Sequence, residues 1–257
     1  MRRVLTALVL IPIVVYLVFF ANVWLFGGVL AAVACLCFHE YRHLASAYGF
    51  GAPHWLGYIA GVPLLFVARE PWAGLLIVAA SLAALALAMK ARNLAHALPR
   101  AAFLALGVVY IFGCWRCAWL IRGRSPHWLM FALVVNWAGD IGAYYVGRSI
   151  GKRRLAERVS PGKTWEGTAG SLVASVLVAG AYLPRFLPGV PILQIVLPTL
   201  ATNAAGQLGD LCESVIKRGA GAKDSGSLLP GHGGMLDRVD STLFALPVVY
   251  AYLTIMG

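Results

Sequence analysis

The chain has 257 residues, of which 60% are hydrophobic and only 12% are charged. Because soluble domains carry about a quarter of their residues as Asp, Glu, Lys or Arg, this composition excludes an ordinary soluble protein and indicates an integral membrane protein. The formal net charge of +11 favours contact with anionic lipid headgroups or with an anionic substrate, and it does not separate the two.

Apolar runs that could cross a bilayer recur along the whole chain. The sequence predicts nine apolar segments, near residues 4–20, 24–46, 55–68, 72–89, 101–121, 126–147, 168–187, 190–216 and 240–256. The third segment is short enough to be re-entrant, and the eighth carries charge at its C-terminal end. Since a span needs about 17–25 apolar residues, the expected fold is an all-α polytopic membrane protein with about eight or nine transmembrane helices.

The chain is expected to form a single integral membrane domain over residues 1–257, because no linker, soluble domain or low-complexity tract interrupts the apolar segments. Within it, residues 1–125 are expected to supply N-terminal helices and residues 126–257 the catalytic half. The first segment imitates a signal peptide but lacks a convincing small-x-small cleavage site. We therefore expect it to be retained as the first helix.

Basic residues predict the orientation of the helices, because Lys and Arg are enriched in cytoplasmic loops. The segment 148–163 holds six basic residues, and Arg2 and Arg3 mark the N-terminus. Six spans separate the two clusters, so both are expected on the cytoplasmic side. Arg122 and Arg124 then fall outside, a departure from the rule that the larger clusters outweigh.

Acidic residues are rare and gather near the C-terminal end, with five of the ten between positions 210 and 240. A charge at the middle of a bilayer costs about 2.5–3.5 kcal/mol on insertion scales, so an intramembrane carboxylate indicates function by default. One set of polar residues recurs at steps of four, three, four and three, which places it along one face of a helix. This set is Asn203, Gln207, Asp210, Ser214 and Lys217.

Two further polar stripes lie in other apolar segments. The second stripe is Asn136, Asp140 and Tyr144, and the third is Asp237, Asp240 and Ser241. Polar groups of this kind can simply hydrogen-bond helices together. Because three helices each carry a carboxylate, we instead expect Asp140, Asp210 and Asp237 to converge at one polar cavity that faces the cytoplasm.

The segment KRGAGAKDSGSLLPGHGG, residues 217–234, alternates basic residues with glycines. Glycine lets backbone N–H groups approach a ligand closely, and Lys and Arg bind phosphate. The flanking carboxylates suit Mg²⁺, which usually binds through one or two carboxylates together with substrate phosphates. The pattern therefore indicates chemistry on a nucleoside triphosphate and a lipid phosphate.

The residues SVIKRGAGAKDSGSLLPGHGGMLDRVD, Ser214 to Asp240, resemble the signature of the phosphatidate cytidylyltransferases, also called CDP-diacylglycerol synthases. Every fixed position of the pattern S-x-hydrophobic-K-R, four residues, K-D, then P-x-H-G-G-hydrophobic-x-D-R-hydrophobic-D is present. The upstream block at 136–167, with its S-P-x-K-T-x-E-G element, and GQLGDL before the signature are similar too. The resemblance covers roughly the C-terminal half of the chain.

The resemblance implies a reaction between CTP and phosphatidate that yields CDP-diacylglycerol and pyrophosphate and requires Mg²⁺. It leaves a second cation such as K⁺ open, suggests a homodimer, and implies membrane lipid but no nucleic acid as a partner. It also implies a location in the bacterial inner membrane with the active site facing the cytoplasm.

Roles for individual residues follow from the resemblance together with the chemistry of the reaction. The attacking phosphate oxygen is already largely ionised, since the second phosphate pKa is about 6. Positioning and charge neutralisation are therefore expected to dominate catalysis. The expected catalytic residues are Asp210, Lys217, Lys223, Asp237, Arg238 and Asp240, with Asp210 and Asp237 as metal ligands. The expected substrate-binding residues are Asp140, Lys163, Ser214, Arg218, Asp224, His232, Gly233 and Gly234.

Two other functions compete with this interpretation. HEYRH, residues 39–43, has the H-E-x-x-H spacing of zinc metalloproteases, and such motifs occur in intramembrane proteases. A third ligand in the usual L-D-G context is missing, because Arg238 follows Asp237. A transporter for an anionic lipid would explain buried charge and glycine breaks, but not the strict spacing of the signature.

Overall fold

The computed structural model describes residues 2–49, 54–91, 93–228 and 233–256. Its helices are α1 (Arg2–Phe19), α2 (Val23–Ala47), α3 (His54–Phe66), α4 (Glu70–Ala88), η1 (Leu94–His96), α5 (Ala97–Gly107), η2 (Val108–Gly113), α6 (Cys114–Arg124), α7 (Pro126–Ile150), α8 (Trp165–Phe186), α9 (Ile192–Gly219) and α10 (Leu236–Met256). The strands are β1 (Arg154–Ala156) and β2 (Ser160–Thr164). Each predicted apolar segment thus corresponds to a helix or to a continuous helical run.

Within the described residues, six helical segments are long and apolar enough to cross a membrane. They are α2, α4, the continuous run Leu94–Arg124, α7, α8 and α10. Among the described residues, the apolar stretches Leu10–Phe19 of α1 and Trp55–Phe66 of α3 are shorter, and α9 carries charged side chains near its C-terminal end. The structure therefore supports an integral membrane protein built from helices, and the larger number of eight or nine spans depends on α1, α3 and α9.

A short antiparallel hairpin lies in the basic loop between α7 and α8, where the sequence predicts no strand. Strand β1 pairs with β2, with Arg154 opposite Thr164 and Ala156 opposite Ser160. Because the strands have three and five residues, their side-chain alternation is too short to stand out in the sequence. The membrane-spanning elements themselves are helical, as predicted.

The chain forms two compact units, and each is described by itself. Unit 1 comprises Met1–Leu120 and Ile216–Arg238, and unit 2 comprises Ile121–Val215 and Val239–Gly257. The helices α9 and α10 each begin in one unit and end in the other. The segment Ile216–Arg238, which includes the glycine-rich residues, groups with the N-terminal helices in unit 1.

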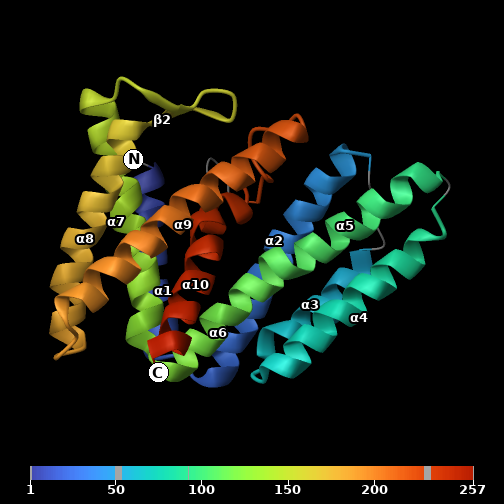
Figure 1. Ribbon diagram of the computed structural model, residues 1–257, viewed down its shortest axis with the longest axis horizontal. Helices are drawn as coiled ribbons and strands as arrows, with labels where there is room; N and C mark the ends of the chain where they lie inside the picture. The colour runs from blue at the N-terminus through green and yellow to red at the C-terminus, as the bar shows by residue number, and fades with distance from the viewer. Residues whose placement is uncertain (1, 50–53, 92, 229–232, 257) are drawn as a thin grey trace. The chain divides into compact units, whose positions relative to one another are not determined.

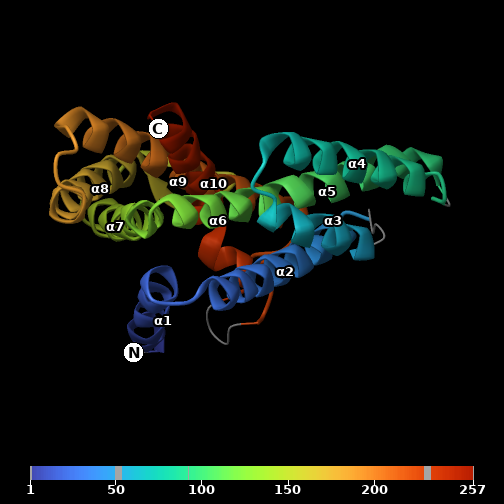
Figure 2. The same cartoon turned by 90° about the horizontal axis from the view of Figure 1, so that it is seen from below.

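Unit 1 packs aromatic side chains against glycines. In Figure 2, α3 lies between α2 and the side-by-side pair α4 and α5. A side chain at Gly61 would overlap the ring of Phe112, and one at Gly107 would overlap Tyr41. Without a water-driven hydrophobic effect between helices in lipid, such close approach is a main source of packing energy.

Unit 2 is built on the antiparallel pair α7 and α8, which lie side by side in Figure 1. Their backbones approach closely, because a side chain at Gly142 would meet the backbone of Gly170. The helix α9 joins them through Asn203, whose amide donates to the hydroxyl of Ser171 at 2.8 Å and of Ser175 at 2.7 Å. These buried hydrogen bonds connect α9 to α8 in the interior of the unit.

Candidate active site

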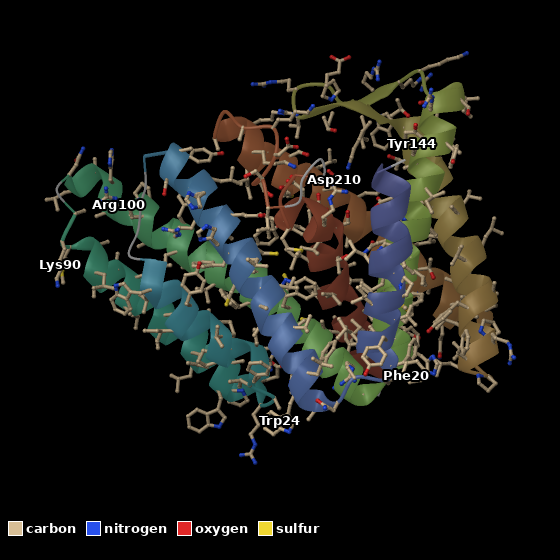
Figure 3. The ribbon with its side chains drawn as sticks, turned by 180° about the vertical axis from the view of Figure 1, so that it is seen from behind. Phe20, Trp24, Lys90, Arg100, Tyr144 and Asp210 are labelled. Carbon is tan, nitrogen blue, oxygen red and sulfur yellow. The ribbon has the colours of Figure 1, made fainter. Side chains whose placement is uncertain are left out.

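A cavity of about 520 Å³ lies in unit 2 between the hairpin and the helices α7, α8 and α9. Figure 3 labels two of its lining residues, Tyr144 on α7 and Asp210 on α9. Its polar lining is Asp140, Tyr144, Arg148, Arg154, Lys163, Thr164, Thr168, Ser171, Gln207 and Asp210. The cavity thus brings together three of the predicted site residues, Asp140, Lys163 and Asp210, with two further arginines that the sequence analysis did not assign.

Lys163 and Asp210 form an ion pair within this cavity. The Lys163 Nζ lies 2.6 Å from Asp210 Oδ2, and the two side chains are 26% and 33% exposed. The hydroxyl of Ser214, one turn further along α9, donates to Asp210 Oδ1 at 3.4 Å. The pair therefore combines an ammonium group suited to phosphate with a carboxylate suited to a cation.

The S-P-x-K-T-x-E-G element explains how Lys163 is held in place. The Thr164 hydroxyl accepts a hydrogen bond from the Gly167 N–H at 3.1 Å, as expected of an N-cap residue of α8. The Glu166 carboxylate accepts from the backbone N–H groups of Lys152 at 3.1 Å and Arg153 at 3.2 Å. These two contacts fasten β2 and the start of the hairpin to the start of α8.

The predicted polar stripe of α9 lies on one face of the helix. The Gln207 amide donates to Asn203 Oδ1 at 2.6 Å, one turn before Asp210. On the opposite side, Leu208 and Val215 are exposed. One hydrogen bond therefore connects the buried Asn203 to Gln207, which lines the cavity together with Asp210.

A second Lys–Asp pair lies in unit 1, where Lys217 Nζ donates to Asp237 Oδ1 at 2.5 Å. Both side chains are nearly buried, 11% and 6% exposed. The other oxygen, Asp237 Oδ2, accepts from Gly234 N at 2.7 Å and lies 2.9 Å from both the backbone nitrogen and the hydroxyl of Ser225. The glycine-rich segment is thus wrapped around the Asp237 carboxylate.

Glu40 of α2 is a member of this cluster that the sequence analysis did not assign to the site. Its carboxylate is buried, and it accepts from Met235 N at 2.9 Å, Leu236 N at 2.8 Å and the Ser225 hydroxyl at 2.9 Å. The available signal was that Glu40 is the one acidic residue of α2, at the end of its long apolar stretch.

Tyr48, which follows α2, contacts the end of α9 next to Lys217. The Tyr48 hydroxyl donates to the Ile216 carbonyl at 2.9 Å. Burial raises the pKa of this hydroxyl, so it stays a neutral donor over the physiological range. A side chain at Gly219 would overlap the Tyr48 ring, which explains why the last turn of α9 carries glycine there.

Two glycines of the signature are required by geometry. Gly233 has φ +77, a conformation that glycine adopts without strain. A side chain at Gly234 would overlap the Ser225 hydroxyl and the Glu40 carboxylate. These glycines therefore shape the loop around Asp237.

The other predicted site residues differ in exposure and in the unit to which they belong. Arg218, Lys223, Asp224 and Arg238 are exposed in unit 1, and Arg218 donates to the Ala222 carbonyl at 3.3 Å. Asp240 belongs to unit 2, is 9% exposed, and accepts from Ser241 N at 2.8 Å. His232 lies outside the described residues.

Comparison with known proteins identifies the family. The model of the Cytidylyltransferase family matches residues 1–256. The chain belongs to the cytidylyltransferase family. This result confirms the resemblance that the signature and the upstream block carry.

Individual relatives agree with this assignment. The chain is 36% identical over 267 residues to a phosphatidate cytidylyltransferase of Pseudomonas aeruginosa, and the alignment covers 100% of this chain and 97% of that protein. It is 44% identical over 159 residues to the phosphatidate cytidylyltransferase of Bacillus subtilis, covering 60% of this chain and 59% of the relative. The enzyme of Haemophilus influenzae is 44% identical over 128 residues, 46% of this chain and 43% of the relative. The last two alignments thus span less than two thirds of those relatives.

Asp210 and Asp237, the predicted metal ligands, carry the oxygen donors that Mg²⁺ prefers. Among the described residues, no three or more His, Cys, Asp and Glu side chains form a ready-made metal cage. Mg²⁺ does not need one, because it is commonly held by one or two carboxylates and substrate phosphates. The backbone N–H groups of Ser225 and Gly234 donate to Asp237 Oδ2, and Lys217 donates to Oδ1, so a cation would bind at Oδ1 beside the Lys217 ammonium group. The donor set therefore fits Mg²⁺ that arrives with a triphosphate.

The H-E-x-x-H motif does not have the geometry of a zinc protease site in this structure. His39 and His43 are exposed side by side, with their Nε2 atoms 3.1 Å apart. A zinc protease uses the glutamate of the motif as a general base beside the metal. Here the Glu40 carboxylate is buried and its oxygens are occupied by N–H and O–H donors of the glycine-rich segment.

We predict that the double change His39→Ala and His43→Ala keeps most of the cytidylyltransferase activity. Both imidazoles are exposed, and neither contributes to the Glu40–Asp237 cluster. Pyrophosphate release by the purified double variant measures the activity that remains. Metal analysis of the wild type is expected to find far less than one zinc per chain. Activity that is lost in the double variant and restored by added zinc would contradict the prediction.

Proposed function

We propose that this protein is a phosphatidate cytidylyltransferase that converts CTP and phosphatidate to CDP-diacylglycerol and pyrophosphate. The observation that carries the proposal is that each predicted metal carboxylate is paired with a lysine, Asp210 with Lys163 and Asp237 with Lys217. An anion must attack another anion in this reaction. Each pair supplies one group that binds a cation and one that binds a phosphate.

The proposed mechanism needs no general base. A phosphate oxygen of phosphatidate attacks the α-phosphorus of CTP, and the bond from that phosphorus to the β-phosphate oxygen breaks to release pyrophosphate. Catalysis by the protein then consists of positioning and charge stabilisation. In unit 2, Arg148, Arg154 and Lys163 line the cavity and stabilise phosphate charge there.

In unit 1, Lys217 contributes an ammonium group next to Asp237. Asp210 and Asp237 are the proposed Mg²⁺ ligands, and the bound cation would neutralise phosphate charge as the leaving group departs. Arg218, Lys223 and Arg238 are proposed to contact the triphosphate, with Asp240 orienting a neighbouring basic group or holding a second cation such as K⁺. Asp140, Ser214, Asp224, His232, Gly233 and Gly234 are proposed to bind substrate.

The proposed setting is the inner membrane, with the N-terminus and the basic hairpin on the cytoplasmic side. In unit 1, Lys90 and Arg100 lie at the same end of the α4–α5 pair (Figure 3), which fits the enrichment of Lys and Arg on the cytoplasmic side. We propose that α1, α3 and α9 are also embedded, so that eight or nine helices span the membrane, and that the protein is a homodimer.

Pyrophosphate release by the purified protein tests the function. With CTP, phosphatidate and Mg²⁺, pyrophosphate and CDP-diacylglycerol are expected in equal amounts. Reactions without Mg²⁺, with diacylglycerol in place of phosphatidate, or with CTP alone are the controls and are expected to give none. Transfer of phosphatidate between vesicle leaflets without pyrophosphate release would instead support the lipid transporter.

A further inference from the structure

The carboxylate of Glu40 lies where the glycine-rich segment ends and α10 begins. Met235 and Leu236 supply backbone N–H groups at the start of α10, and they donate to Oε1 at 2.9 Å and Oε2 at 2.8 Å of Glu40. The first N–H groups of any helix lack partners within that helix. In this protein two of them are satisfied by a side chain nearly 200 residues earlier in the chain.

The same carboxylate is connected to Asp237 through one hydroxyl group. The Ser225 Oγ lies 2.9 Å from Glu40 Oε2 and 2.9 Å from Asp237 Oδ2, and the Asp237 N–H donates to it at 3.3 Å. Because Ser225 is 5% exposed and Glu40 is also 5% exposed, water does not replace these contacts easily. Glu40 and Asp237 are therefore connected through buried contacts.

The space around this connection is already filled. An added side chain at Gly226 would come within 2.8 Å of Glu40 Oε1, and one at Gly234 would overlap both Glu40 and Ser225. Gly226 and Gly234 thus pack against Glu40 with no room for a side chain. With Oδ2 of Asp237 held by the backbone N–H groups of Ser225 and Gly234, Oδ1 is directed toward Lys217.

We propose that Glu40 is a positioning residue for cytidylyl transfer, which orients Asp237 through the start of α10 and through Ser225. This inference rests on the proposed role of Asp237 in binding Mg²⁺. Glu40 itself does not touch substrate. Its negative charge also stabilises the start of α10, where the helix dipole is positive.

The change Glu40→Gln tests the proposal because it keeps the size of the side chain. Glutamine has one oxygen and one NH₂ group, so it places a donor against at least one of the N–H or O–H groups that Glu40 accepts. Loss of a partner that orients a metal ligand typically costs about 10–100-fold in metal affinity or activity. We therefore expect a higher Mg²⁺ concentration for half-maximal turnover and a lower kcat, with the KM for phosphatidate near that of the wild type.

Three other full-length variants complete the experiment. Ser225→Ala removes the bridging hydroxyl and is expected to shift the Mg²⁺ requirement in the same direction. The double variant Glu40→Gln with Ser225→Ala is expected to lose less than the product of the single effects, because both act through one connection. Glu70→Gln is the matched control, since it removes a carboxylate of unit 1 that pairs with Arg116 instead.

Activity is compared among variants that elute as folded protein in size-exclusion chromatography, and Ser225→Ala decides if Glu40→Gln does not fold. A raised Mg²⁺ requirement in the Glu40 or Ser225 variant, with Glu70→Gln close to wild type, supports the proposal. The proposal is overturned if the Glu40 and Ser225 variants both keep the Mg²⁺ requirement of the wild type, even when their turnover falls. That result leaves the proposed function intact. The Asp237→Asn protein separates the two, because wild-type activity in that protein would refute the metal role itself.

Discussion

The Asp237→Asn protein is expected to lose Mg²⁺-dependent pyrophosphate release, whereas Asp240→Asn is expected to keep a measurable remnant or to shift the metal requirement. Asp237 accepts hydrogen bonds at both oxygens, from Lys217 on one side and from Ser225 and Gly234 on the other. An asparagine there must turn its NH₂ group toward one of these donors, and it removes the charge that a cation needs. The Asp240 oxygen Oδ1 accepts from Ser241 N, a role that the asparagine oxygen can fill.

Pyrophosphate release is measured for both variants over a range of Mg²⁺ concentrations, with size-exclusion chromatography as the control for folding. The comparison is informative because the two changes are chemically identical and lie three residues apart on α10. Near-normal activity with an unchanged Mg²⁺ requirement in Asp237→Asn would show that the carboxylate of Asp237 is not a metal ligand.

The Lys163→Ala protein is expected to turn over about 10²–10³ times more slowly than the wild type, the usual cost of losing one electrostatic contact to developing charge. Lys163 lines the cavity and pairs with Asp210 at 2.6 Å. Its removal leaves Asp210 without this ammonium partner and leaves a substrate phosphate with one cation fewer. The loss is expected mainly in kcat and in the KM for the substrate whose phosphate occupies the cavity.

Lys152→Ala is the matched control for Lys163→Ala. Lys152 is an exposed lysine of the same basic loop, and its side chain does not line the cavity. Steady-state kinetics with varied CTP and varied phosphatidate then separate a local contact from the loss of any positive charge. Equal activity in the two variants would remove Lys163 from the catalytic machinery.

The positions of the helices and the face of α9 that carries the polar residues are properties that the sequence indicates by itself. Apolar length reports burial in lipid, and a step of three or four residues reports a shared helix face, because both depend on neighbours along the chain. The contacts of Asn203 with Gln207 and of Asp210 with Ser214 follow this spacing. The signature likewise indicated the family, since its residues are contiguous in the chain.

Contacts between side chains that are distant in sequence are visible only in the tertiary structure. The motif spacing of HEYRH suggests a metal site with Glu40 beside it, but the fold turns Glu40 toward Ser225 and the start of α10, and leaves His39 and His43 exposed. The hairpin that brings Lys163 to Asp210 was likewise absent from the predicted elements, because its strands are too short to show a period. Hydropathy and periodicity report which face of a helix is buried, and only the packing of helices determines which buried groups meet.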